Sequence, residues 1–197
     1  TISTTSAIIL DPRVMEYHKR NPQVRFEIHE GNTNELFGWL SAGIVELAIT
    51  RTPVADKSFH CFCLRPPEPM IALMQKELDW CPERAQISFA ELSGRPLIYH
   101  RRYRSVVEDE CRKNGFVPRC VSISNVRNSV LWAASGIGIA LVPQTAVFYA
   151  PGADMVAKEL DFPLASSQQC VAWHKEHPLS HPARKFLSIL GYKSPRR

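Results

Sequence analysis

Four short clusters of hydroxyl, amide and imidazole side chains fall where the sequence changes from a strand pattern to a helix pattern. They are Thr4–Thr5–Ser6, Asn32–Thr33–Asn34, His100–Tyr103 and Ser124–Asn125. The first turn of a helix has backbone N–H groups without partners in the helix, together with the positive end of the helix dipole. Small anions bind at such positions. The clusters therefore indicate sites for a carboxylate, a phosphate or a sulfonate.

Arginine side chains accompany these clusters. Arg51 follows a strand pattern, and Arg101 and Arg102 lie inside the third cluster beside Tyr103, which could supply an aromatic wall. A guanidinium can hold a carboxylate through two parallel hydrogen bonds. The alternatives stay open, because each cluster can be an ordinary helix cap and each arginine can form a surface ion pair. Only the joint pattern favours an anion site.

Strand and helix patterns alternate along the chain, which predicts an α/β fold with mainly parallel sheets. The strand patterns cover residues 24–29, 45–50, 70–74, 96–99, 120–124, 137–142 and 170–173. The helix patterns cover residues 12–19, 34–42, 88–92, 106–113, 126–134, 144–149 and 182–190. Ligands of such sheets bind beyond the carboxyl ends of the strands. The four polar clusters fall at such ends.

Several helix ends are marked by their residues. Asp11 before Pro12 is typical of an N-cap followed by a proline at the first helical position. The apolar residues 6–10 leave an earlier start of this helix open. Ser105 with Glu108 predicts a capping box, and Gly115 predicts the end of that helix.

One layout occurs twice. The segments "SAGIVELAI" (41–49) and "ASGIGIALV" (134–142) each carry a glycine, Gly43 or Gly136, between a helix that starts at a polar cluster and a buried strand. The repetition predicts two lobes of similar build. The prolines at 66, 67 and 69 indicate a stiff passage between the lobes. We expect residues 1–68 with 173–197 in one lobe and residues 69–172 in the other, with the anion in the cleft between them.

Composition narrows the class of protein. The chain has 197 residues and a net charge of +5, without a dense basic tract apart from residues 193–197, so a DNA-binding face is not indicated. It has no long apolar run and no signal-peptide pattern. Its start resembles the middle of a strand, so we expect a piece of a longer, cytoplasmic chain. In that compartment the six cysteines should be reduced.

An enzyme is the alternative suggested by one cysteine-rich segment. The segment "HCFC" (60–63) places His60, Cys61 and Cys63 together, but its spacing is not that of a zinc site. Strand alternation instead predicts Cys61 and Cys63 as a buried pair on one face. The sequence has no nucleophile elbow, phosphate loop or His-Glu-x-x-His motif. We therefore expect no catalytic residue, no metal and no cofactor.

The stretch from residue 10 to residue 50 closely resembles the ligand-sensing domain of LysR-type transcriptional regulators. The matching motifs are Asn21–Pro22, "EGNT" at 30–33, "LSAG" at 40–43 and "ELAI" at 46–49, with Glu46 where the family usually has Asp. Farther on, "AASGIGIALVP" (133–143) and "HPARKFLSIL" (181–190) are similar to family segments. The resemblance covers nearly the whole chain.

The resemblance implies two Rossmann-like lobes joined by two crossover segments, as in type 2 periplasmic binding proteins. It implies effector contacts at Thr5 with its neighbours Thr4 and Ser6, at Thr33 and at the loop His100–Tyr103. It also implies self-association, as a dimer of this domain and a tetramer of the full protein, and contact with DNA only through a winged helix-turn-helix that is absent here. A free-standing solute-binding protein of a transport system is the alternative.

Overall fold

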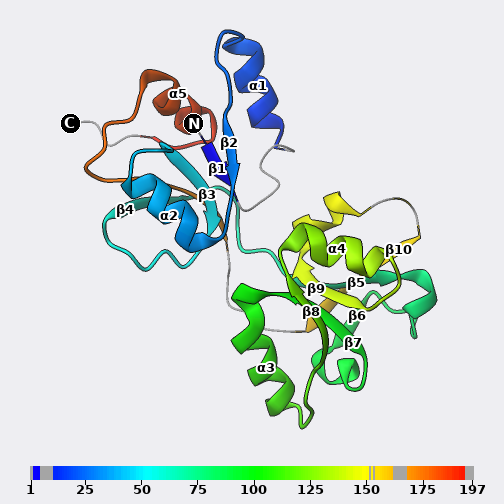
Figure 1. The fold of residues 1–197 in the computed structure, drawn as a ribbon. Helices are drawn as coiled ribbons and strands as arrows, with labels where there is room; N and C mark the ends of the chain where they lie inside the picture. Colours follow the sequence, from blue (N-terminus) through cyan, green and yellow to red (C-terminus); the bar gives the residue numbers. More distant parts are fainter. Residues whose placement is uncertain (1, 5–10, 151, 153, 162–167, 194–197) are drawn as a thin grey trace. The chain divides into compact units, whose positions relative to one another are not determined.

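The computed structural model describes residues 2–4, 11–150, 152, 154–161 and 168–193, and these form two units, each with its own sheet (Figure 1). Unit 1 comprises Thr1–Pro67 and Ser167–Arg197, and unit 2 comprises Glu68–Ser166. The sequence predicts the return to the first lobe at residue 173. The whole of strand β11 (Gln169–His174) already belongs to unit 1, because it pairs with two strands of that unit.

The sheet of unit 1 has the strand order β2-β1-β3-β11-β4. Its other strands are β1 (Ile2–Thr4), β2 (Ile28–Glu30), β3 (Leu47–Arg51) and β4 (Phe59–Cys63). Strand β1 is parallel to β2 and β3, whereas β11 is antiparallel to β3 and β4. The sheet is therefore mixed, and the expectation of mainly parallel pairing is too simple.

Helices cover both faces of this sheet. Alternate residues of a strand point to opposite sides, so the apolar strand β3 contributes to a core on each face. Leu47 and Ile49 belong to the core with Tyr17 and Phe186, from helices α1 (Pro12–Arg20) and α5 (His181–Ile189). Ala48 belongs to the other core, which includes residues of helix α2 (Thr33–Ser41).

The sheet of unit 2 has the order β6-β10-β5-β9-β7-β8. Its strands are β5 (Met70–Gln75), β6 (Gln86–Ser88), β7 (Pro96–His100), β8 (Arg119–Ser124), β9 (Ile139–Pro143) and β10 (Met155–Asp161). Helix α3 (Arg104–Lys113) contributes Val107 and Cys111 to one core, and helix α4 (Val126–Ala134) contributes Val130 and Ala133 to the other. Strands β7, β8 and β9 are parallel, and β5 is antiparallel to β9 and β10.

Most predicted helix ends are confirmed. The Asp11 side chain accepts the N–H of Arg13 and caps α1, with Pro12 as the first helical residue. Gly43 and Gly136 follow α2 and α4 with φ values of 68° and 78°, a left-handed conformation that glycine adopts without strain. The capping box at Ser105 is wrong, because α3 begins at Arg104, two residues before the predicted start, and Glu108 pairs instead with Arg104 at 2.8 Å.

The sequence predictions also omit strands β4, β6 and β10. Residues 89–92 and 144–149 lie within the predicted helix ranges 88–92 and 144–149, but they form 3-10 helices (η3 and η5). Among the described residues, no helix is both long and apolar enough to cross a membrane.

Candidate functional site

The carboxyl ends of β1, β2 and β3 meet at one edge of the sheet in unit 1, because the three strands are parallel. The backbone of Thr4 aligns with Glu30 of β2 and with Ile49 of β3. Thr33 follows β2 as the first residue of α2, and Arg51 is the last residue of β3. The structure therefore brings three of the predicted site positions to this edge. Thr5 and Ser6 lie outside the described residues.

The N-terminus of α2 is closed by a capping box. The Asn32 Oδ1 accepts the N–H groups of Asn34 at 3.0 Å and Glu35 at 3.2 Å, and the Glu35 carboxylate accepts the N–H of Asn32 at 2.6 Å. Asn32 is thus a structural cap. The Glu35 carboxylate already complements the helix dipole, so an anion at this edge depends more on a cationic side chain than on the dipole.

Arg51 is that cationic side chain. It is only 8% exposed, and its partner across the sheet is Gln169, the first residue of β11, which is 7% exposed. Next to this pair, Gln168 forms two hydrogen bonds with Thr52, both 2.9 Å long. The Gln168 carbonyl oxygen accepts the N–H of Thr52, and the Gln168 backbone N–H donates to the Thr52 Oγ1. Gln168 and Gln169 are not among the predicted neighbours of Arg51, because the sequence predicts them in the other lobe.

The two polar clusters of unit 2 also share an edge. His100 and Ser124 are aligned at the ends of the parallel strands β7 and β8. The Asn125 Oδ1 accepts the N–H of Asn128 at 2.8 Å and caps α4. The Ser124 Oγ lies 3.1 Å from the Oγ of Ser129, which is fully buried and was missed by the sequence analysis.

His100 is a neutral hydrogen-bonding group at this edge. Burial lowers its pKa below the ordinary value, and the charges of Arg102 and Arg101 lower it further. Its Nδ1 accepts the N–H of Arg102 at 2.9 Å, so the proton of the neutral ring resides on Nε2, which is a donor. Arg101 is exposed. Tyr103, by contrast, belongs to the hydrophobic core and is only 4% exposed.

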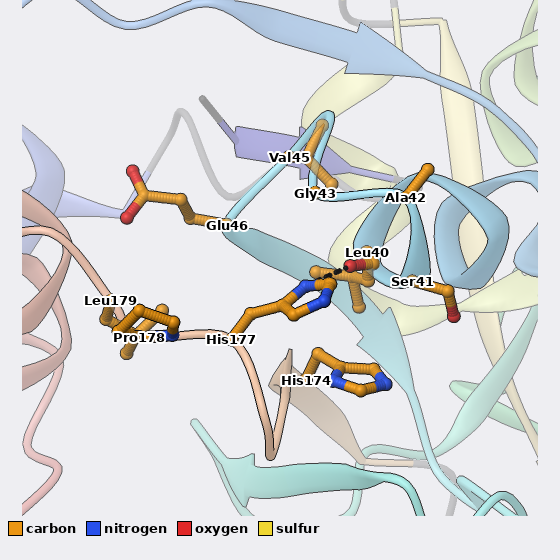
Figure 2. Close-up of a pocket in the computed structure, with 10 residues that line it drawn as sticks. All are labelled: Leu40, Ser41, Ala42, Gly43, Val45, Glu46, His174, His177, Pro178 and Leu179. Atoms are coloured by element: carbon orange, nitrogen blue, oxygen red, sulfur yellow. Dashed lines mark hydrogen bonds between the residues drawn. The ribbon is translucent and has the colours of Figure 1, made fainter.

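A pocket of about 260 Å³ lies elsewhere in unit 1, at the C-terminal end of α2 (Figure 2). In Figure 2 the His177 ring points to the Leu40 carbonyl, 3.1 Å from its Nδ1. The rings of His177 and His174 are neighbours, with centroids 4.3 Å apart and an angle of 31° between their planes. Glu46 also lines the pocket. Helix carbonyls and a carboxylate disfavour an anion. None of the predicted site residues lines this pocket.

A metal centre is not formed by the described residues, since no group of three or more His, Cys, Asp or Glu side chains among them is arranged to hold an ion. The chemistry available at the two carboxyl edges is therefore hydrogen bonding and charge pairing by Arg51, Thr33, His100 and the hydroxyls beside it.

The sequence was compared with protein families and with curated proteins. The family model described as "LysR substrate binding domain" matches residues 1–193. An uncharacterized HTH-type transcriptional regulator, YvbU of Bacillus subtilis (strain 168), is 22% identical over 164 residues. That match covers 82% of this chain and 55% of the relative, so the chain spans about half the length of this regulator.

Solved structures show the same fold. The C-terminal domain of a probable LysR family transcriptional regulator from Rhodococcus sp. RHA1 is 23% identical, with a TM-score of 0.78 and 97% of both chains covered. The CcmR regulatory domain of Synechocystis PCC6803, in complex with 2-PG, is 16% identical, with a TM-score of 0.78 and coverage of 96% of this chain and 93% of that one.

Proposed function

Because the chain belongs to the LysR substrate binding domain family, we propose that it is the sensing domain of a LysR-type transcriptional regulator and that its effector is a small anionic metabolite. The fold of this family is a mixed α/β fold of the type found in type 2 periplasmic binding proteins, and the two sheets described above have that organisation.

The observation that carries the proposal is the position of Arg51. Arg51 is only 8% exposed, and it lies at the sheet edge where β1 ends and α2 begins. Charge attraction is several times stronger in such a partly dehydrated place than in bulk water. A carboxylate that reaches this edge can accept charge-assisted hydrogen bonds from the guanidinium. The Thr33 hydroxyl, at the start of α2, is a further polar group at this edge.

Unit 2 supports the same class of ligand. Its edge offers the Nε2–H of His100, the hydroxyl of Ser124 and the nearby Arg101 and Arg102. These groups suit the polar end of an organic acid. That a single effector contacts both edges, in a cleft between the lobes, stays a prediction.

Sensing requires that the effector bind one conformation of the protein better than another, since only differential affinity can shift an equilibrium. We propose that this shift alters the oligomer that holds DNA, through a helix-turn-helix in the part of such regulators that this chain does not include. The dimer of this domain and the tetramer of the full regulator belong to the same proposal. The CcmR regulatory domain bound to 2-PG supports a small ligand as effector.

The alternatives are less well supported. The family model and the curated relatives point to regulators, so a solute-binding protein of a transport system is not favoured. We propose no catalytic role, because the groups at both edges suit binding and their pattern matches no catalytic motif.

A thermal-shift screen tests the proposal. Small carboxylates, phosphates and sulfonates are compared with the matching amides and alcohols, at constant ionic strength. We expect one family of acids to raise the unfolding temperature, since a ligand at a hundred times its Kd stabilises the folded state by about 2.7 kcal/mol. Stabilisation by neutral analogues alone would contradict an anionic effector.

A further inference from the structure

Three cysteines lie together on one face of the pair formed by β4 and β11. Cys63 and Cys170 are directly opposite each other in the antiparallel register. Cys61 precedes Cys63 by two residues in β4, so its side chain points to the same face. All six cysteines belong to the described residues, and none is joined to another by a disulfide.

These three thiols differ in access to solvent. Cys170 is buried, whereas Cys61 and Cys63 are exposed on β4, which is the edge strand of the sheet. The prediction of a buried pair at Cys61 and Cys63 is therefore wrong. Edge position explains the difference, because β11 is the only strand that pairs with β4 in the described part of the chain. A small reagent can reach two of the thiols, and the third lies beside Cys63 on strand β11.

The pairing geometry suits a disulfide between Cys63 and Cys170. Hydrogen bonds join Leu64 N–H to Gln169 O at 2.8 Å and Lys175 N–H to Ser58 O at 2.9 Å. Rungs of an antiparallel pair alternate between hydrogen-bonded and non-hydrogen-bonded, so Cys63 and Cys170 occupy a non-hydrogen-bonded rung. Opposite Cα atoms in such rungs lie about 4.5 Å apart. That separation falls within the range found in disulfides.

The chemistry of the thiols also differs. A hydrogen bond from the Cys170 side chain lowers the pKa of Cys61, against the opposing effect of burial. Partial loss of water around its sulfur and the nearby Cys61 raise the pKa of Cys63. The thiolate is the attacking species in disulfide exchange, so Cys61 is the better nucleophile of the two exposed thiols.

We propose that Cys61, Cys63 and Cys170 form a thiol–disulfide exchange site that reacts with low-molecular-weight disulfides. The Cys61 thiolate attacks one sulfur of the incoming disulfide, which forms a mixed disulfide and releases the other half as a thiolate. Cys170 attacks the Cys61 sulfur, and its proton passes to the second half of the reagent, which leaves as a thiol. Cys63 then attacks the Cys170 sulfur, and its proton passes to Cys61, which leaves as a thiol. Overall, two protein thiols become one disulfide and one small disulfide becomes two thiols.

This site is separate from the proposed effector function. It uses no residue of the anion-binding edges, and its test needs no effector. Failure of the thiol site therefore leaves the sensing proposal standing, and the reverse also holds.

The test is peptide mapping after treatment of the native chain with oxidised glutathione. Trypsin leaves Cys61 and Cys63 in peptide 58–76, because Arg65 precedes a proline, and Cys170 in peptide 159–175. We expect these two peptides to be joined by a disulfide through Cys63 and Cys170. An equal mixture of ¹⁵N-labelled and unlabelled protein should give only light–light and heavy–heavy pairs, as an internal bond requires.

Variants separate the roles. In Cys170→Ser the cross-link should be lost, with glutathione retained on Cys61. In Cys61→Ser the same cross-link should form more slowly, and in Cys63→Ser the bond should join Cys61 to Cys170. Cys120→Ser, at an exposed cysteine in unit 2, is the matched control and should leave the cross-link unchanged.

Three results would overturn the proposal. One is glutathione on Cys61 and Cys63 while Cys170 stays reduced. Another is a cross-link between light and heavy chains. The third is reaction of the buried Cys81 and Cys111 in step with Cys170, which would show that only the unfolded chain reacts.

Discussion

His100 and Ser124 are aligned at the last rung of the parallel strands β7 and β8, so an imidazole and a hydroxyl meet at the carboxyl edge of unit 2. The imidazole accepts the Arg102 N–H through Nδ1, and that hydrogen bond requires an unprotonated nitrogen. Protonation of His100 would break the bond and place a third positive charge beside Arg101 and Arg102. The edge is therefore built for a neutral imidazole.

This arrangement makes stability depend on pH. The folded state holds the pKa of His100 below its unfolded value, mainly through burial, so the unfolded chain binds more protons as the pH falls. Neutral, buried His100 therefore stabilises the folded state above its unfolded pKa of about 6.5, and this stabilisation is lost at lower pH. We expect the unfolding temperature to drop between pH 7.5 and pH 5, and to drop less in His100→Gln. His18→Gln, at an exposed position of α1, should behave like the wild type.

Asp11 should stabilise the folded chain through its charge. Its carboxylate, 3% exposed, contacts Arg13 at 2.7 Å and Arg65 at 3.0 Å. Burial raises the pKa of Asp11, but the hydrogen bonds from both arginines outweigh this and leave the pKa well below its usual range. Asn is also a good N-cap, so Asp11→Asn mainly removes the charge. We expect a loss of about 2 kcal/mol in the free energy of unfolding at neutral pH, by urea titration.

The Asp11 effect has a defined pH window. A depressed carboxyl pKa stabilises the protein above the unfolded pKa of about 3.9, and this stabilisation disappears as the pH falls further. The difference between wild type and Asp11→Asn should therefore shrink below pH 4. The surface substitution Asp109→Asn, which affects an exposed ion pair with Arg112, should cost much less at neutral pH. Equal losses in the two variants would contradict this account.

Lys158 and Asp79 form a buried ion pair in unit 2. Their side chains are 2% and 4% exposed, with 3.0 Å between Nζ and Oδ2, and Nζ also donates to the carbonyls of Cys81 and Arg84. Lys158→Met leaves a carboxylate buried without its cation, which should cost about 3–5 kcal/mol in chemical denaturation. Adding Asp79→Asn should recover part of that loss. A double variant less stable than Lys158→Met would contradict the assignment.

Substitution by alanine should have opposite effects on stability at Gly138 and at Gly38. A Cβ on Gly138 would lie 2.7 Å from the Pro96 carbonyl oxygen, in the backbone of the neighbouring strand β7. We expect Gly138→Ala to destabilise the protein by about 1–3 kcal/mol, the usual range for overpacking. Gly38 lies inside α2 with open space around it, so Gly38→Ala should stabilise by about 0.5–1 kcal/mol. Thermal unfolding of both variants measures the contrast.

Local signals in the sequence predicted much of the fold. The apolar runs of β3, β5, β7 and β9 are buried along nearly their whole length, so their patterns are unambiguous. Asp11 and Gly43 marked helix ends correctly, because capping and left-handed backbone conformation depend on neighbouring residues alone.

Features set by distant contacts could not be predicted. Strand β10 contains the sequence "KELD", whose charged residues are typical of a loop. The buried ion pair between Lys158 and Asp79 allows this segment to form a strand in the core. The unit to which β11 belongs depends on its pairing with β3, more than a hundred residues earlier. The pocket in Figure 2 likewise joins His177 to Leu40, which are 137 residues apart.

The central claim is that Arg51 and Thr33 bind the anionic effector. Calorimetric titration with the best acid from the thermal-shift screen tests it most directly, with Arg51→Gln and Thr33→Val beside the exposed control Arg112→Ala. We predict a Kd at least about tenfold higher in Arg51→Gln, a loss of about 1.4 kcal/mol, a smaller loss in Thr33→Val and no change in the control. A Kd equal to that of the wild type in both edge variants, with the fold intact, would contradict the claim.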